Sequence, residues 1–140
     1  MPSNAKRQDT LVKAIGALLT GDISTCEDVF TRDVVWISPV MTTSSRDELE
    51  TRLSSRAGAL ANIELSLTHL VADGDLAVAE WRVAADHVQP FVVAEDTRLD
   101  PGGERVALGG VTVADFQGGR ISAIRHYFDR ATMLEQLLGD

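Results

Sequence analysis

Residues 106–128 read VALGGVTVADFQGGRISAIRHYF, and they constrain the architecture more than any other stretch of the chain. The segments 106–116 and 121–128 are rich in β-branched and aromatic residues, and their alternating apolar and polar positions are typical of strands with one buried face. Gly118 and Gly119, which lie between them, form a dipeptide that favours a tight turn. This stretch therefore predicts a β-hairpin.

Two more strands are predicted upstream of this hairpin. Apolar residues and His69 alternate with polar residues over 63–69, and 76–88 reads as a long strand beyond the turn signal Asp73-Gly74-Asp75. The stretch 89–105 is predicted to be irregular. Gly109-Gly110 is interpreted, like the later glycine pair, as a turn or bulge dipeptide. The four strands should form an antiparallel meander.

Helical spacing dominates the first sixty residues. Leu11, Ile15 and Leu18 recur at the period of a helix, which predicts a helix over about residues 6–20 that stops at Gly21. A short second helix is predicted after Asp22 or Ser24, because Ser24 and Glu27 have the spacing of a capping box. Its expected inward-facing residues are Ile23, Cys26 and Phe30.

Two other helices are predicted, one before and one after the strands. Ser45 and Glu48 again have capping-box spacing, and the third helix is expected to carry an apolar stripe of Leu49, Leu53, Ala57 and Leu60. A brief β-type run, 34–37, precedes it. The last helix is predicted over 130–138, with Asp129 as its N-cap.

The order of helices, four strands and a final helix indicates an α+β fold, in which a curved, mostly antiparallel sheet packs against N-terminal helices. A single domain over residues 1–140 is expected, with residues 1–7 flexible. No internal repeat or second domain is visible in the sequence.

Composition and charge exclude several classes of partner. With 13 basic and 21 acidic residues, the formal charge of −8 repels nucleic acid and anionic membranes. No run approaches the roughly 20 apolar residues that span a bilayer, and residues 1–8 lack the apolar segment of a signal peptide. The single cysteine, Cys26, excludes an internal disulfide and a paired-cysteine metal site. A cytoplasmic protein is therefore expected.

Three stretches resemble a known family: LVKAIGALLTGDISTCEDVFTRDVVWISP (11–39), ADGDLAVAEWRV (72–83) and DFQGGRISAIRHYFDRATMLEQLL (115–138). Over about residues 8–138 the chain is similar to the SnoaL-like branch of the nuclear-transport-factor-two-like superfamily. The resemblance implies a cone-shaped domain whose bent sheet and helices enclose a small apolar pocket. Members include polyketide cyclases, ketosteroid isomerase, limonene epoxide hydrolase and dehydratases.

Because side chains alternate along a strand, the resemblance also implies which residues line that pocket. The expected inner-face residues are Trp36, Ser38, Trp81, Val83, Thr112, Ile124, His126 and Phe128.

Most catalytic residues of these family members are not present at the corresponding positions of this chain. The catalytic base of ketosteroid isomerase falls on Ser38, and its two acidic donors fall on Ala14 and Thr112, so that reaction is rejected. The relay of limonene epoxide hydrolase falls on Trp81, Val83 and His126, of which only the histidine could act as a base. The aspartate acid/base of the SnoaL-type cyclases falls on Asp129.

Each candidate residue has a functional and a structural interpretation. His126 is either a general acid/base or a hydrogen-bonded core histidine. Asp129 either assists catalysis or only caps the last helix. Trp36 and Trp81 either form a flat slot for an aromatic ligand or simply pack the core. The hydroxyls of Ser38 and Thr112 bind either a ligand or the local backbone. Val83 and Phe128 complete the expected ligand-binding set.

No cofactor or metal is expected. His69, His87 and His126 are scattered, without a His-x-His pair or a His-Glu-x-x-His motif, and there is no phosphate loop or dinucleotide fingerprint. The preferred hypothesis is a cofactor-independent cyclase, isomerase or lyase that acts on a small apolar or aromatic carbonyl compound. The alternative is a non-catalytic small-molecule-binding or assembly module. In either case a homodimer through the outer sheet face is expected.

Overall fold

The computed structural model describes residues 3–94, 97–102 and 105–137. In chain order its elements are α1 (Asn4–Thr20), α2 (Cys26–Val29), β1 (Phe30–Ile37), β2 (Thr42–Thr43), α3 (Arg46–Ser54), β3 (Leu60–Asp73), β4 (Leu76–His87), β5 (Phe91–Ala94), β6 (Thr97–Leu99), β7 (Arg105–Gln117), β8 (Arg120–Phe128) and α4 (Arg130–Leu137).

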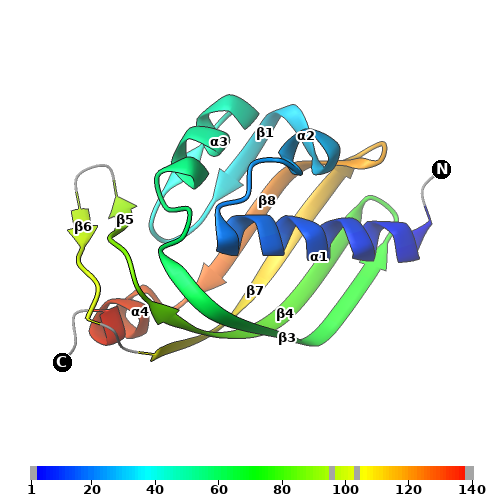
Figure 1. The fold of residues 1–140 in the computed structure, drawn as a ribbon. Helices are drawn as coiled ribbons and strands as arrows, with labels where there is room; N and C mark the ends of the chain where they lie inside the picture. Colours follow the sequence, from blue (N-terminus) through cyan, green and yellow to red (C-terminus); the bar gives the residue numbers. More distant parts are fainter. Residues whose placement is uncertain (1–2, 95–96, 103–104, 138–140) are drawn as a thin grey trace.

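The predicted α+β class and the four-strand meander are confirmed. β3, β4, β7 and β8 lie next to one another in antiparallel pairs, and α1 crosses one face of the sheet (Figure 1). β1 joins the far side of β8 as a parallel strand, and β2 pairs with β1, which completes an open six-stranded sheet. The parallel pair joins segments about ninety residues apart, so local sequence periodicity did not indicate it.

Helix α1 begins earlier than the apolar spacing indicated. The Ser3 side chain accepts a hydrogen bond from the backbone N–H of Lys6, which caps the helix, and Gly21 ends it in the left-handed conformation at φ 75°. Residues 4–7, which belong to the stretch 1–7 that was expected to be flexible, form the first turn of this helix.

Arg7 ties this first turn to both predicted hairpins. The residue is only 4% exposed, and its guanidinium donates to the Gly74 carbonyl, to Asp75 Oδ1 at 2.9 Å and to the Gly118 carbonyl at 3.4 Å. A buried charge is tolerated when it is paired and hydrogen-bonded, as here. The N-terminal end of α1 is thus held against the turns of β3–β4 and β7–β8.

The two helices that follow α1 differ from the prediction in their ends or caps. α2 starts at Cys26, and Ser24 donates its backbone N–H to Asp22 Oδ1 at 2.9 Å, so the expected capping box is not formed. Ile23 is exposed, contrary to the prediction, and Phe30 is the first residue of β1. The Ser45 cap of α3 is confirmed by a 3.1 Å bond from Glu48 N–H.

The strands also differ from the sequence pattern in detail. α3 ends at Ser54, and Leu60 begins β3 instead of continuing the helical stripe. A bulge between Leu67 and His69 reverses the alternation, so His69 faces solvent. Gly109-Gly110 is not a turn or bulge, because both glycines lie in unbroken register with β4. The stretch predicted to be irregular contains the antiparallel pair β5–β6.

The space between α1 and the sheet is filled at one end and hollow at the other. Close to the two hairpin turns, the buried side chains of Leu11, Phe30, Phe116 and Ile121 pack together in the core. The opposite end of the sheet, where α4 lies in Figure 1, holds the chamber described below. The chamber is lined by residues of α1, the sheet and α4. No helix within the described residues is both long and apolar enough to cross a bilayer.

Candidate functional site

An inner chamber of about 120 Å³ lies between the C-terminal half of α1, the inner face of the sheet and α4. Its walls are mainly aliphatic and aromatic. A dry cavity of about 150 Å³ in another protein holds benzene, so this volume suits one small ring and not a polycyclic compound. Two ionisable residues, Arg56 and His126, are found among the described residues that line it.

Strand alternation placed most of the predicted residues at the chamber. Trp36 comes from β1, Trp81 and Val83 from β4, and His126 and Phe128 from β8, while Ser38 follows β1. Thr112 does not line the chamber, although its side chain is on the inner face and fully buried. Ile124 is likewise a fully buried core residue.

Thr112 connects two of the lining residues through its hydroxyl group. Trp81 Nε1–H donates to Thr112 Oγ1 at 2.8 Å, and Thr112 Oγ1 lies 2.6 Å from His126 Nδ1. A hydroxyl has one proton, and the indole can only donate. Both bonds use a polar hydrogen if the Thr112 hydroxyl accepts from the indole N–H and donates its own proton to His126 Nδ1. In that arrangement the imidazole proton is on Nε2.

Nε2 of His126 is therefore a protonated donor at the chamber, whose lining also includes the Trp36 indole and the Arg56 guanidinium. This imidazole nitrogen is buried and has no hydrogen-bond partner among the described residues. Burial, together with the positive charge of Arg56, lowers the pKa of His126 from 6.5 to about 3. At neutral pH the imidazole is thus uncharged, and its Nε2–H is a hydrogen-bond donor.

Two indoles hold the imidazole edge-on. The ring of Trp36 lies 6.2 Å from that of His126 at an interplanar angle of 87°, and the ring of Trp81 lies 6.5 Å away at 76°. Such T-shaped contacts are favourable for aromatic pairs. Together with the Thr112 bond, they fix the direction of the imidazole plane.

Sequence reasoning missed Arg56, the second polar group of the chamber. It follows α3, and its guanidinium carbon lies 5.8 Å from the centre of the Trp36 ring. The residue as a whole is half-buried, but Nε and Nη1 are buried, and burial lowers the pKa to about 10. The guanidinium remains charged at neutral pH. A signal was available, because Arg56 continues the helical spacing of Leu49 and Leu53 and interrupts their apolar stripe.

The remaining candidates have structural partners. The Ser38 hydroxyl donates to the Met41 carbonyl at 3.1 Å and accepts from the backbone N–H of Met41 at 3.2 Å. Asp129 is exposed, and its Oδ1 accepts from the backbone N–H of Ala131 at 2.9 Å, which confirms its predicted cap on α4. Asp129 borders a depression on the outer face of the sheet and not the inner chamber.

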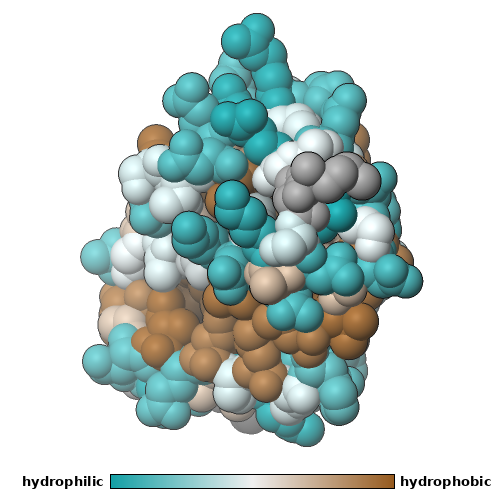
Figure 2. Space-filling view, turned by 90° about the vertical axis from the view of Figure 1, so that its right-hand side faces the viewer, coloured by the Kyte–Doolittle hydropathy of each residue, from teal (hydrophilic) through white to brown (hydrophobic). Residues whose placement is uncertain are grey.

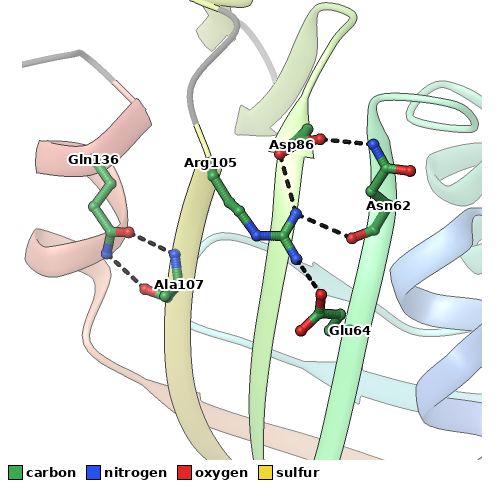
Figure 3. A network of polar contacts seen from close by, with 6 residues as sticks. All are labelled: Asn62, Glu64, Asp86, Arg105, Ala107 and Gln136. Atoms are coloured by element: carbon green, nitrogen blue, oxygen red, sulfur yellow. Dashed lines mark hydrogen bonds and ion pairs between the residues drawn. The ribbon is translucent and has the colours of Figure 1, made fainter.

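The rim of the chamber beside α4 is held by polar contacts that Figure 3 shows. β7 continues past the end of β8, and the Gln136 side chain takes the place of a strand there, donating to the Ala107 carbonyl at 2.7 Å and accepting from the Ala107 N–H at 2.6 Å. Nearby, Arg105 bonds the Asn62 carbonyl and the carboxylates of Asp86 and Glu64. These side-chain bonds connect β3, β4 and β7 in addition to the backbone hydrogen bonds of the sheet.

The outer face of the sheet carries a row of apolar residues. Val71, Val78 and Val113 are register partners across β3, β4 and β7, and Val71 is 58% exposed. Figure 2 shows the side of the molecule where the hairpin turns lie, with hydrophobic residues in a band across the lower part of the view. His69 and Glu80 form an exposed 2.9 Å pair on the same sheet face. No group of three potential metal ligands is found among the residues that the structure describes.

A helix-covered open sheet with one small, mostly apolar inner chamber defines a pocketed α+β domain. Residues 11–124 match the family model described as a SnoaL-like domain, and the chain belongs to this family. No curated protein matches the sequence.

Solved structures share the fold at low identity. A protein proposed to be a SnoaL-like polyketide cyclase from Jannaschia sp. CCS1 is similar with a TM-score of 0.82 and 13% identity, over 100% of this chain and 96% of that one. TsrD from Streptomyces laurentii has a TM-score of 0.78 and 18% identity, over 98% of each chain. An LEH-like epoxide hydrolase from M. tuberculosis has a TM-score of 0.73 and 22% identity, over 98% of this chain and 92% of that one.

Proposed function

We propose that this chain binds a small, mostly apolar carbonyl compound in the inner chamber, with the carbonyl oxygen accepting a hydrogen bond from His126 Nε2–H. One observation carries the proposal: a buried, uncharged imidazole has one nitrogen engaged by Thr112 and the other without a partner among the described residues. A buried donor without a partner is costly, and a ligand oxygen would satisfy it.

The ligand would be a single-ring or similarly small molecule. The chamber volume of about 120 Å³ supports this size limit. Trp36 and Trp81 supply flat apolar walls, and Val83 and Phe128 add to them, so the ligand needs only one polar group. No cofactor enters this proposal.

The decisive test compares a ketone with a hydrocarbon of the same shape. Replacing His126 by Phe should weaken binding of cyclohexanone about tenfold and that of methylenecyclohexane by less than about twofold, because only the ketone loses a hydrogen bond. Both tryptophans of the chain line the chamber, so their two indole N–H resonances in NMR spectra report the titrations. Equal effects on both ligands, or no binding by the wild type, would refute the proposal.

A second candidate is a cofactor-independent isomerase, lyase or cyclase that acts on the same compound. The position of Arg56 favours it, because a guanidinium at the chamber would stabilise negative charge developing on the ligand oxygen. In that case His126 would carry its proton on Nδ1 and use the Nε2 lone pair as general base. A pKa of about 3 makes His126 a weak base. Asp129 borders the outer depression and not the inner chamber, so it would affect only the orientation of β8 and α4. Binding is therefore the better-supported function.

Exchange of the α-hydrogens of bound cyclohexanone in D₂O separates the two candidates. Catalysis of proton transfer would accelerate the exchange and the acceleration would disappear in His126→Phe. Binding alone would leave the exchange rate at that of the free ketone.

The same proposal includes a homodimer formed through the outer row of Val71, Val78 and Val113. Placing a charge in this row should produce a monomer, because association would bury it. We therefore expect Val71→Glu to halve the mass measured by sedimentation equilibrium. Val88→Glu is the matched control, since Val88 is 45% exposed and lies beyond the end of β4. A monomeric wild type would exclude the dimer.

A further inference from the structure

Gly110 lies opposite Trp81 in the ladder between β7 and β4. A Cβ atom added at this glycine would lie 2.6 Å from Cζ2 and 2.7 Å from Cη2 of the Trp81 ring. It would also lie 2.7 Å from the Tyr127 carbonyl oxygen, and real Cβ atoms essentially never come within 3.0 Å of another heavy atom. The six-membered ring of the indole thus occupies the space of a missing side chain.

The indole is held at both of its ends on the same face of β7. At one end Nε1–H donates to Thr112 Oγ1, and at the other end the six-membered ring rests on Gly110. Gly110 and Thr112 are two positions apart, so they share the inner face of the strand. The position of Trp81, which lines the inner chamber, is therefore set by this pair of small residues.

We propose that Gly110 is a positioning residue that sets the width of the inner chamber through Trp81, and so limits the ligand to a single ring. This inference rests on the proposed function. A side chain at position 110 would push the indole towards the chamber or displace the Tyr127 carbonyl, and Tyr127 lies between His126 and Phe128, which both line the chamber. Either displacement reduces or deforms the volume available to the ligand.

The neighbouring glycine provides a matched control. A Cβ atom at Gly109 would lie 3.7 Å from the Trp81 carbonyl oxygen and 3.9 Å from Arg82 Cγ, which are ordinary contacts. Gly109 points to the outer face, because successive residues of a strand alternate. Neither glycine has a left-handed φ, so alanine is compatible with the backbone at both positions. Gly109→Ala and Gly110→Ala therefore differ mainly in their effect on Trp81.

The test titrates wild type, Gly109→Ala and Gly110→Ala with acetone, cyclohexanone and acetophenone and follows the two indole N–H resonances. In Gly110→Ala we expect a shifted Trp81 resonance without ligand, at least about tenfold weaker acetophenone binding, and less than about threefold weaker acetone binding. Gly109→Ala should match the wild type. The inference is overturned if Gly110→Ala has the wild-type Trp81 resonance. It is also overturned if the relative affinities of this variant for the three ketones equal those of the wild type.

A second variant keeps the test decisive if Gly110→Ala does not fold. Trp81→Phe retains Gly110 and replaces the two fused rings of the indole by a single smaller ring. The chamber should therefore widen, and 2-acetylnaphthalene should gain at least about tenfold in affinity relative to cyclohexanone. An unchanged preference would overturn the inference. If the wild type binds none of the ketones, the proposed function fails, while the Trp81 resonance of Gly110→Ala still decides whether this glycine positions the indole.

Discussion

Lowering the pH from 6.5 to about 4.5 is expected to reduce the free energy of unfolding by about 2–3 kcal/mol through His126 alone. The native pKa is about 3, whereas the unfolded chain has the ordinary value of 6.5. Between these values the unfolded state binds more protons than the native state, at about 1.4 kcal/mol per pH unit. The stability that the uncharged His126 contributes is therefore fully present above pH 6.5. It decreases as the pH falls below 6.5 and continues to decrease until the pH reaches the native pKa.

Urea denaturation of the wild type and of His126→Phe at several pH values measures this effect. The variant lacks the titrating imidazole, so its stability should decline less over this window. His69→Phe, which replaces an exposed histidine by the same residue, is measured alongside as the matched substitution. Four carboxyl groups with lowered pKa values contribute mainly below the window: Asp22, Glu80, Asp86 and Asp129. Parallel curves for the wild type and His126→Phe would show that the imidazole titrates normally in the native protein.

Replacing Thr112 by Val is expected to reduce the free energy of unfolding by about 2–6 kcal/mol, although the two side chains have the same shape. The hydroxyl accepts from Trp81 Nε1–H and donates to His126 Nδ1, and all three groups are buried. Valine removes both bonds at once and leaves two buried polar atoms without partners. Each such atom costs about 1–3 kcal/mol.

Denaturant titration measures the loss, and Thr112→Ser is the matched control. Serine keeps the hydroxyl and loses one methyl group, so it should retain the shift of the Trp81 indole N–H resonance that reports this bond. Valine should abolish the shift. If Thr112→Val is as stable as Thr112→Ser, the Trp81–Thr112–His126 chain does not contribute to stability in the way inferred above.

The elements that the sequence predicted well are those governed by local periodicity. The hairpins at Gly74 and Gly118, the Ser45 and Asp129 caps and the long α1 helix depend on residues close together in the chain. β1 was recognised only in part, and its parallel pairing with β8 was not, because a parallel neighbour is chosen by the packing of distant segments. The bulge at His69 was not predicted either, because it is defined by the pairing of β3 with β4.

The composition of the chamber was only partly predictable. Strand alternation correctly placed Trp36, Trp81 and His126, because it requires only that each strand be identified and its register kept. Arg56 was missed because it lies in the turn after α3 and interrupts the apolar stripe of Leu49 and Leu53, although it continues their helical spacing. Gly110 was misinterpreted as a turn or bulge residue, because its contact with the Trp81 ring is visible only in the tertiary structure.

By itself the sequence determined the α+β class and the strand faces, because apolar residues at a period of two or of 3.6 can be buried together in only a few ways. Only the tertiary structure decided the chemistry of the chamber. The pKa of His126, the hydrogen-bond chain through Thr112 and the space beside Gly110 depend on distances between residues that are far apart in sequence. Burial and hydrogen bonding act through those distances, and no local pattern of residues encodes them.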